Sequence, residues 1–454
     1  MSHDLSRAAS HIVEGRGTAL EALERSLVAA RSPAAEAAFT RLFEDAARGA
    51  AAAVDAARSA GQTMPALAGL AVSVKALFDV EGCVTTAASR SLAEAPPARA
   101  DATVVARLRA AGAALIGHTN MTEFAFSGVG INPHHGTPVN PATRALDAQP
   151  RIPGGSTSGG ATSVAVGAAW AALGTDTGGS LRIPAALQGL VGFKCTAALV
   201  PNAGSIPLSP SLDSSGAITL SVRDAVLLHE VLAARETTLA ERPLSARRLA
   251  VPKNVMLDAL EPAVAEAFER TLARLSAAGA SLTEIDLPPL ADAASLQRGG
   301  GLAAAESWAW HAHRLTQHGA EYDPRVALRI RRGATLGAAD VAALHRERRD
   351  WIARMEAALA GWDAVLSPTV PMVAPRTAPL VASDEAFFAA NALLLRNPSL
   401  VNLLDGCALS LPCHQPGDWP VGLMVWGPAH TDDRVLSISL AIESVLRNAQ
   451  GARW

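Results

Sequence analysis

Two clusters rich in glycine and serine enclose a largely apolar segment in the middle of this chain. The clusters lie at residues 154–160 and 174–180, and the segment between them, residues 161–173, is 13 residues long. A membrane helix needs ~20 apolar residues, so this segment is too short to cross a bilayer. Glycine tolerates tight turns and close backbone approach. We therefore predict a buried helix over residues 161–173, with a glycine-rich loop at each end.

The composition is that of a globular protein. Of the 454 residues, 49% are hydrophobic and 18% are charged, which is the opposite of the balance in disordered chains. The length allows one large α/β domain or two or three smaller ones. The net charge of −3 gives no reason to expect a nucleic acid or an anionic lipid surface as a partner.

Cysteine usage and the N-terminal segment indicate a cytoplasmic protein. The four cysteines lie far apart without a CxxC pair, which favours reduced, buried thiols over disulfides or a zinc site. Residues 1–30 carry acidic and basic side chains among alanines and leucines, so they lack the apolar core of an export signal. We expect a soluble protein that does not enter a membrane.

Predicted strands and helices alternate in the first half of the chain. Charges at helical spacing over residues 17–60 predict two surface helices. Residues 67–80 predict a buried strand, residues 101–112 a helix capped by Asp101, and residues 113–117 a short strand. Such alternation favours an α/β sheet whose strands are mostly parallel.

A charged, irregular stretch at residues 234–246 is the nearest feature to an internal boundary. Beyond it, the hydrophobic pattern predicts further helices and strands. Helices are expected at residues 261–278, 303–314, 338–359 and 432–447, and strands at residues 248–253, 363–368, 408–412 and 422–426.

A single lysine, Lys75, stands near the end of the strand predicted at residues 67–80. Its neighbours are Val72, Val74, Ala76 and Leu77, so an apolar setting is expected. Burial lowers the pKa of a lysine and can leave it neutral enough to act as a base. The alternative is a lysine at a strand end that extends its ammonium into solvent.

Other catalytic arrangements lack their signatures here. None of the twelve histidines lies in either glycine-serine cluster, and Thr157, not serine, occupies the centre of the GxSxG-like segment at residues 155–159. Neither cluster ends in the Gly-Lys-Ser/Thr of a phosphate-binding loop, and there is no HExxH zinc motif. The segment Gly178-Gly179-Ser180 can aim consecutive backbone N–H groups at one point, as an oxyanion site requires, although an ordinary turn has the same composition.

At this point the sequence resembles a known family. Residues 153–196 (PGGSTSGGATSVAVGAAWAALGTDTGGSLRIPAALQGLVGFKCT) closely resemble the signature block of the amidase signature family. Residues 69–80 resemble the family's lysine segment, and residues 101–141 its second characteristic stretch. Residues 363–371 and 420–423 are similar as well, so the resemblance covers most of the chain.

The resemblance implies a catalytic triad. It places the catalytic lysine on Lys75, a relay serine on Ser156 after a cis peptide bond, and the nucleophile on Ser180. In the implied mechanism, neutral Lys75 takes a proton through Ser156 while Ser180 attacks the carbonyl carbon of an amide. The implied oxyanion donors are the backbone N–H groups of Thr177, Gly178 and Gly179.

Three further residues are expected to support this site. Asp176 and Arg182 bracket the nucleophile, and we interpret them as an ion pair that holds the loop. Ser158 belongs to Ser158-Gly159-Gly160, where many relatives have Gly-Gly-Ser, and because Ser156 keeps its spacing this departure changes little.

The resemblance also implies a single amidase domain over residues 1–454 that needs no cofactor and no metal. We expect a large twisted mixed sheet, mostly parallel, with helices on both faces. The expected parts are an N-terminal helical segment (1–65), the signature core (66–233), a mainly helical half (234–360) and a C-terminal return to the core (361–454). A homodimer is compatible with the sequence.

The substrate is expected to be a small carboxamide, cleaved to a carboxylate and ammonia or an amine. The substrate pocket is predicted at Phe124, Phe126 and Ser127, together with aromatic residues of the 300–400 region. Apolar walls of this kind would favour aryl or alkyl amides over charged ureides such as allophanate.

Other activities also fit this machinery. Carbamate or ureido hydrolysis remains an alternative, as does a glutaminase-type subunit of a tRNA-dependent amidotransferase. A catalytically silent scaffold on the same fold is a further alternative.

Overall fold

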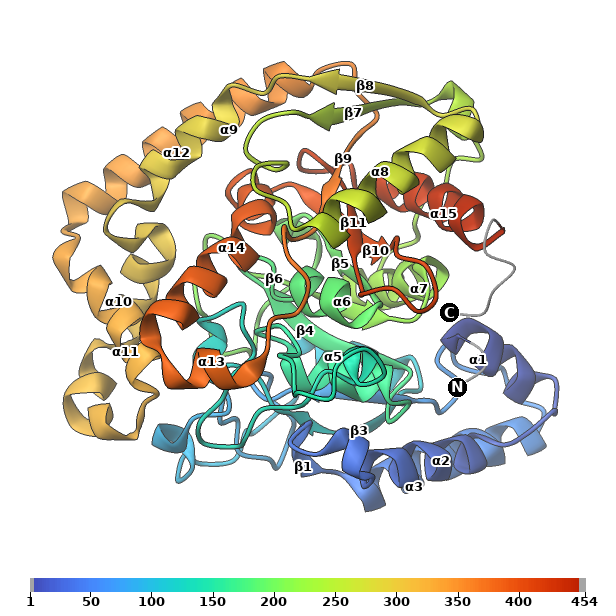
Figure 1. Ribbon diagram of the computed structural model, residues 1–454. Helices are drawn as coiled ribbons and strands as arrows, with labels where there is room; N and C mark the ends of the chain where they lie inside the picture. Colours follow the sequence, from blue (N-terminus) through green and yellow to red (C-terminus); the bar gives the residue numbers. More distant parts are fainter. Residues whose placement is uncertain (1–3, 449–454) are drawn as a thin grey trace.

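An eleven-stranded mixed sheet runs through the computed structural model, which describes residues 4–448 (Figure 1). Its strand order is β1-β3-β2-β4-β6-β5-β10-β11-β9-β7-β8. The strands are β1 (Phe39–Leu42), β2 (Ala71–Lys75), β3 (Ala114–Thr119), β4 (Ala171–Asp176), β5 (Val191–Lys194), β6 (Ser214–Thr219), β7 (Arg248–Pro252), β8 (Ser281–Ile285), β9 (Ala364–Pro368), β10 (Cys407–Pro412) and β11 (Gly422–Gly427).

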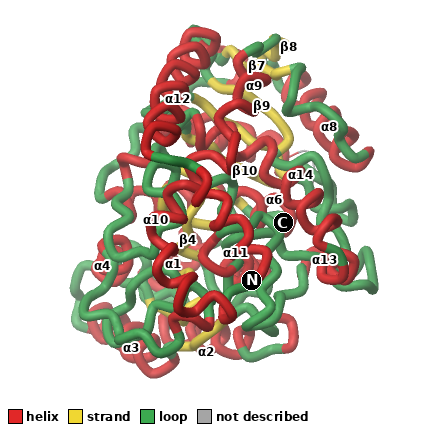
Figure 2. Tube along the Cα trace, turned by 90° about the vertical axis from the view of Figure 1, so that its left-hand side faces the viewer, coloured by secondary structure: helices red, strands yellow, loops and turns green. Residues whose placement is uncertain are grey.

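Helices surround this sheet, so that most of the strands lie inside the molecule (Figure 2). The α-helices are α1 (Leu5–Val13), α2 (Ala19–Ala30), α3 (Glu44–Ser59), α4 (Thr103–Ala110), α5 (Ser158–Ala165), α6 (Arg182–Gln188), α7 (Val222–Ala233), α8 (Pro262–Ala277), α9 (Pro289–Asp292), α10 (Gly301–His318), α11 (Pro324–Arg331), α12 (Ala338–Leu359), α13 (Thr377–Ala382), α14 (Asp384–Leu403) and α15 (Asp432–Asn448).

The two faces of the sheet pack against different helices. Along β4, Ala171 and Leu173 belong to one apolar core, whereas Ala172 belongs to another, as the alternation of side chains along a strand requires. The first core includes buried residues of α7 and α15, and the second includes residues of α5 and α6. The prediction of a mixed sheet with helices on both faces is therefore confirmed.

The prediction that the strands are mostly parallel is wrong. Parallel pairs occur only at β3-β2-β4 and at β9-β7-β8 within the described residues, and the other neighbours are antiparallel. The loops that join β5 to β6 and β10 to β11 contain no α-helix. Antiparallel neighbours can be joined without a crossover helix. The alternation of strands and helices in the first half of the chain therefore predicted more parallel strand pairs than the sheet contains.

Two local predictions also need correction. The apolar stretch at residues 161–173 is not one helix, because α5 ends at Ala165, the chain turns through Gly167 at φ 77°, and β4 begins at Ala171. Both parts are buried, so hydrophobicity alone does not separate them. Asp101 does not cap α4; its carboxylate accepts hydrogen bonds from Glu81 N and Arg109 Nε instead.

The second half of the chain returns to the same sheet. Strand β10 pairs with β5, so strands that precede and strands that follow the irregular stretch at residues 234–246 belong to one sheet. Helices α10, α11 and α12 lie at one flank of the molecule, and α14 runs from that flank towards the centre (Figure 1). Sequence patterns did not predict α11 or α14, although α14 contributes directly to the site described below.

Candidate active site

The site forms where two neighbouring parallel strands end. Strands β2 and β4 pair in register, with Val74 opposite Leu173, and they end at Lys75 and Asp176. Because the carboxyl ends of parallel strands meet at one edge of a sheet, residues that follow them are brought together. This arrangement places Lys75 beside Thr175.

Lys75 is completely buried and lies against hydroxyl groups. Its Nζ is 2.8 Å from Ser156 Oγ, 2.9 Å from Thr175 Oγ1 and 3.4 Å from the Thr175 carbonyl oxygen. Burial lowers the pKa of Lys75 to about 7, although the carboxylates of Asp176 and Asp213 oppose the shift. A neutral amine can donate its two protons to the Thr175 oxygens, and its lone pair can accept a hydrogen bond from the Ser156 hydroxyl.

Ser156 follows a cis peptide bond, as the resemblance implies. Its carbonyl oxygen accepts a hydrogen bond from Thr122 N at 3.1 Å, and its side chain is fully buried. The preceding position accepts only glycine, because a Cβ on Gly155 would come within 2.7 Å of the backbone nitrogen of Gly130. The chain then enters α5 at Ser158.

Ser180 stands in the turn between β4 and α6 and lines a cavity. Thr157 N donates to the Ser180 carbonyl at 3.3 Å, so the residue after Ser156 contacts Ser180 directly. The turn needs glycine at Gly179, where φ is 126° and a Cβ would lie 2.6 Å from Pro398 Cβ.

The three predicted oxyanion donors are not equivalent. Gly179 N donates to Asp176 Oδ1 at 2.8 Å and is therefore engaged within the protein. Thr177 N and Gly178 N have no hydrogen-bond partner within residues 4–448, and both residues line the cavity next to Ser180. These two N–H groups are the ones available to a substrate oxygen.

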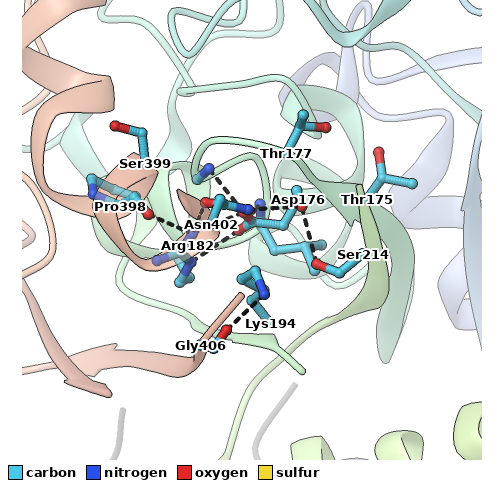
Figure 3. A network of polar contacts seen from close by, with 12 residues as sticks. Thr175, Asp176, Thr177, Arg182, Lys194, Ser214, Pro398, Ser399, Asn402 and Gly406 are labelled. Carbon is cyan, nitrogen blue, oxygen red and sulfur yellow. Dashed lines mark hydrogen bonds and ion pairs between the residues drawn. The ribbon is translucent and has the colours of Figure 1, made fainter. Parts of the chain in front are cut away.

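Asp176 and Arg182 form a fully buried ion pair below this turn (Figure 3). Arg182 Nη2 lies 2.8 Å from Asp176 Oδ1 and also donates to Asn402 Oδ1 at 2.6 Å. Asn402, from α14, donates its amide to Asp176 Oδ1 at 2.9 Å. Burial alone would raise the pKa of Asp176, but the charge and hydrogen bonds of Arg182 hold it below its usual value.

A second buried carboxylate, Asp213, supports the turn from the other side. It accepts hydrogen bonds from Thr177 Oγ1, from Leu208 N at 3.0 Å and from Ser209 N at 3.1 Å. Burial raises the pKa of Asp213 to about 6 despite these bonds. No local motif in the sequence marks Asp213 as part of the site.

The cavity beside Ser180 has a volume of about 630 Å³. Phe126 and Ser127 line it, as predicted, and so does Phe388 from α14. Phe124 is not among its lining residues and packs instead in an aromatic cluster with Trp310, His311 and Tyr322. Ser158 also has no visible supporting contact, since its buried hydroxyl has no hydrogen-bond partner within residues 4–448.

The charged residues that line this cavity are all basic. Arg329, Arg332 and Arg396 line it, and its described lining contains no Asp or Glu. The walls were expected to be apolar, and most lining residues are apolar. The three arginines carry no local signal, because α11, the turn that follows it and α14 reach the site only through the tertiary fold.

The family model for Amidase matches residues 21–436. The chain belongs to the amidase family. It is 37% identical over 409 residues to a 2-amino-5-chloromuconic acid deaminase from Comamonas testosteroni, an alignment that covers 88% of this chain and 86% of the relative. It is also 35% identical over 432 residues to one subunit of a glutamyl-tRNA(Gln) amidotransferase from Symbiobacterium thermophilum, covering 87% and 86% of the two chains.

Solved structures agree with this assignment. A crystal structure of an amidase superposes with a TM-score of 0.86 at 35% sequence identity, covering 98% of this chain and all of the other. The chain is thus a hydrolase that acts on carbon–nitrogen bonds of amides, and the resemblance found in its sequence is confirmed. Within residues 4–448, no helix is both long and apolar enough to cross a membrane.

Proposed function

We propose that this amidase hydrolyses a small-molecule carboxamide through Ser180, with Ser156 and Lys75 as a proton relay. Ser180 Oγ forms a bond to the amide carbon, and its proton passes to Ser156, whose own proton passes to Lys75 Nζ. The carbonyl oxygen becomes an oxyanion that Thr177 N and Gly178 N can bind. The relay then returns the proton to the leaving nitrogen, the C–N bond breaks, and water hydrolyses the acyl-enzyme.

One observation supports this mechanism most strongly. The Lys75 amine is excluded from water, has a pKa of about 7 and lies 2.8 Å from Ser156 Oγ. A general base works best when its pKa is close to the operating pH and it is within hydrogen-bond reach of the proton that it removes. Lys75 meets both conditions, and a lysine that extended into solvent would meet neither.

The substrate is proposed to be a free small molecule. The relatives' names include both a deaminase of an amino-chloromuconic acid and an amidotransferase component. A cavity of about 630 Å³ is in the range of small-molecule sites. The cytoplasm is proposed as the site of action because all four cysteines are buried and unpaired. Carbamates and ureides are alternative substrate classes, and the experiment below compares them with amides.

Ammonia release by the purified chain tests this proposal. We expect hydrolysis of at least one class in a panel of aliphatic, aryl, ureido and carbamate compounds without any partner protein. Ser180→Ala should abolish it at unchanged melting temperature. If ammonia appears only after an amidotransferase partner is added, the stand-alone hydrolase is ruled out. Hydrolysis at a normal rate by Ser180→Ala would exclude Ser180 as nucleophile.

A further inference from the structure

The basic residues of the cavity have no acidic counterpart. Arg329, Arg332 and Arg396 all line it, none of them forms an ion pair within the described residues, and no Asp or Glu lines the same cavity. Elsewhere on the protein arginines commonly pair with carboxylates, as Arg325 does with Asp384. An enclosed positive charge without a counter-charge is unfavourable, so a cavity of this kind suits an anionic ligand.

Arg329 is the arginine best placed to bind such a ligand. It extends from α11, donates from Nη1 to the Phe126 carbonyl and stacks over the Phe126 ring, with its guanidinium carbon 4.3 Å from the ring centroid. Its Nε and Nη2 have no partner among residues 4–448. Stacking therefore fixes the guanidinium while leaving donors free, an arrangement that suits bidentate recognition of a carboxylate.

The other two arginines are less suited to this role. Arg396 already donates to Asn397 Oδ1 at 3.0 Å and to the carbonyl oxygens of Met256 and Asp258. Arg332 is exposed at the cavity rim, where solvent screens its charge. We therefore expect Arg332 to attract an anion and Arg329 to bind it.

Asn391 adds a second donor to the same cavity. Its Oδ1 accepts hydrogen bonds from Ser127 Oγ at 3.0 Å and from Gly128 N at 2.9 Å, which fixes the orientation of the amide. Its Nδ2 has no partner within residues 4–448, and the residue lines the cavity. Because the acceptor is occupied by the protein, Asn391 can offer only N–H donors to a ligand.

We propose that the substrate carries a carboxylate besides the scissile carboxamide, and that Arg329 and Asn391 bind this carboxylate. The inference rests on the proposed function and narrows it to half-amides of dicarboxylic acids and related amido acids. Hydrolysis of such a substrate yields a dicarboxylate. Aryl and alkyl amides, which the sequence favoured, then become the poorer substrates where they carry no carboxylate, because they leave the arginine unpaired.

The test compares two substrates of equal length in the wild type and in two variants. The substrates are the half-amide of a short dicarboxylic acid and the neutral primary amide that ends in a methyl group. We expect the wild type to prefer the half-amide. Arg329→Gln should raise its KM about 10- to 100-fold with little change in kcat. The neutral amide should lose much less than the half-amide, because it has no carboxylate to pair with Arg329, and Arg329→Lys should restore part of the loss.

Arg331→Gln is the matched control. It lies on the same helix but does not line the cavity, so both substrates should behave as in the wild type. The carboxylate site is excluded if the wild type shows no preference for the half-amide. It is also excluded if Arg329→Gln lowers turnover of both substrates equally.

A binding measurement separates this inference from the catalytic proposal. Calorimetric titration of Ser180→Ala with a short dicarboxylate and with its uncharged dimethyl ester needs no turnover. We expect the dicarboxylate to bind more tightly, and added salt to weaken only that binding. Equal affinity for the two ligands would overturn the carboxylate site whether or not the enzyme hydrolyses amides.

Discussion

Lys75 shows how the surroundings of a buried residue can suit it to the role proposed for it. The chain has three lysines, and Lys75 is the one whose amine contacts a serine hydroxyl within the described residues. Lys194 is equally buried, but its ammonium donates to the carbonyl oxygens of Cys195 and Gly406, which hydrogen-bond a charged amine without offering it a proton. Burial alone therefore does not suit a lysine to act as a base, and the role proposed for Lys75 depends on its hydroxyl partner.

The pH dependence of turnover follows from the lowered pKa of Lys75. The amine acts as a base only when it is unprotonated, so kcat/KM should rise with pH, about tenfold per unit below pH 7, and level off above it. A steady-state profile from about pH 5.5 to 9 measures this. A profile that stays flat across neutral pH would argue against a lysine base.

The charge of Asp213 provides a second test of the pH profile of kcat/KM. Its negative charge favours the protonated form of Lys75 and so raises the pKa of the lysine. Asp213→Asn removes that charge, and the midpoint of the profile should move to lower pH. An unchanged midpoint would mean that the charge of Asp213 does not act on Lys75 and that Asp213 supports the site only through Thr177.

At the scale of residues, the places in the fold that carry a local signal could be predicted from the sequence, while the catalytic roles stay predictions. Lys75, Ser156 and Ser180 stand in short segments of characteristic composition, and their positions at strand ends or turns follow from those segments. Asp213, Asn391 and Arg329 carry no such local signal. Their roles depend on contacts with residues far away in the chain, such as the contact of Ser127 with Asn391.

At the scale of elements, the turn between β4 and α6 depends on the last part of α14. Asn402 contributes hydrogen bonds to both Asp176 and Arg182, and Pro398 contributes a carbonyl acceptor for Arg182 Nη2 at 3.0 Å. The N–H groups of Thr177 and Gly178 are thus held by a helix more than 200 residues further along the chain. Sequence patterns did not reveal α14, since its apolar residues do not follow one face.

Substitutions in this network should have graded effects on stability. Arg182→Met leaves the Asp176 carboxylate buried without its counter-charge, so we expect a loss of about 3–5 kcal/mol in the free energy of unfolding. Asn402→Ala removes hydrogen bonds but keeps the ion pair, and a loss of about 1–3 kcal/mol is expected. Urea denaturation followed by circular dichroism measures both. If Arg182→Met were the milder change, the ion pair would not be what holds the turn.

At the scale of the whole molecule, a single sheet joins strands from the two halves of the chain. The composition and the alternation of elements predicted an α/β protein, and the family resemblance predicted helices on both faces. The strand order and the antiparallel pairings could not be predicted in this way. They depend on which connections lack a helix and on long-range pairs such as Ala408 opposite Lys194.

The buried amine of Lys75 also affects global stability. Its pKa is about 7 in the folded protein and about 10.5 when unfolded, so between these values the unfolded chain binds more protons and stability rises with pH. The free energy of unfolding of the wild type minus that of Lys75→Met should therefore increase by about 1.4 kcal/mol per pH unit above pH 7. Denaturation curves at several pH values measure this difference.

Lys253→Met, at an exposed lysine, is the matched control for that experiment. The difference between the wild type and this variant should stay nearly constant over the same range. If the Lys75→Met curve also runs parallel to that of the wild type, then Lys75 is protonated in the folded protein and cannot be the base.

The most direct test of the catalytic account is the site and rate of labelling by a fluorophosphonate probe, followed by peptide mass spectrometry. We expect a single adduct on Ser180, formed much more slowly in Lys75→Met and at nearly the wild-type rate in Lys194→Met. An adduct on another residue, or an undiminished rate without the Lys75 amine, would contradict the proposed relay from Ser180 through Ser156 to Lys75.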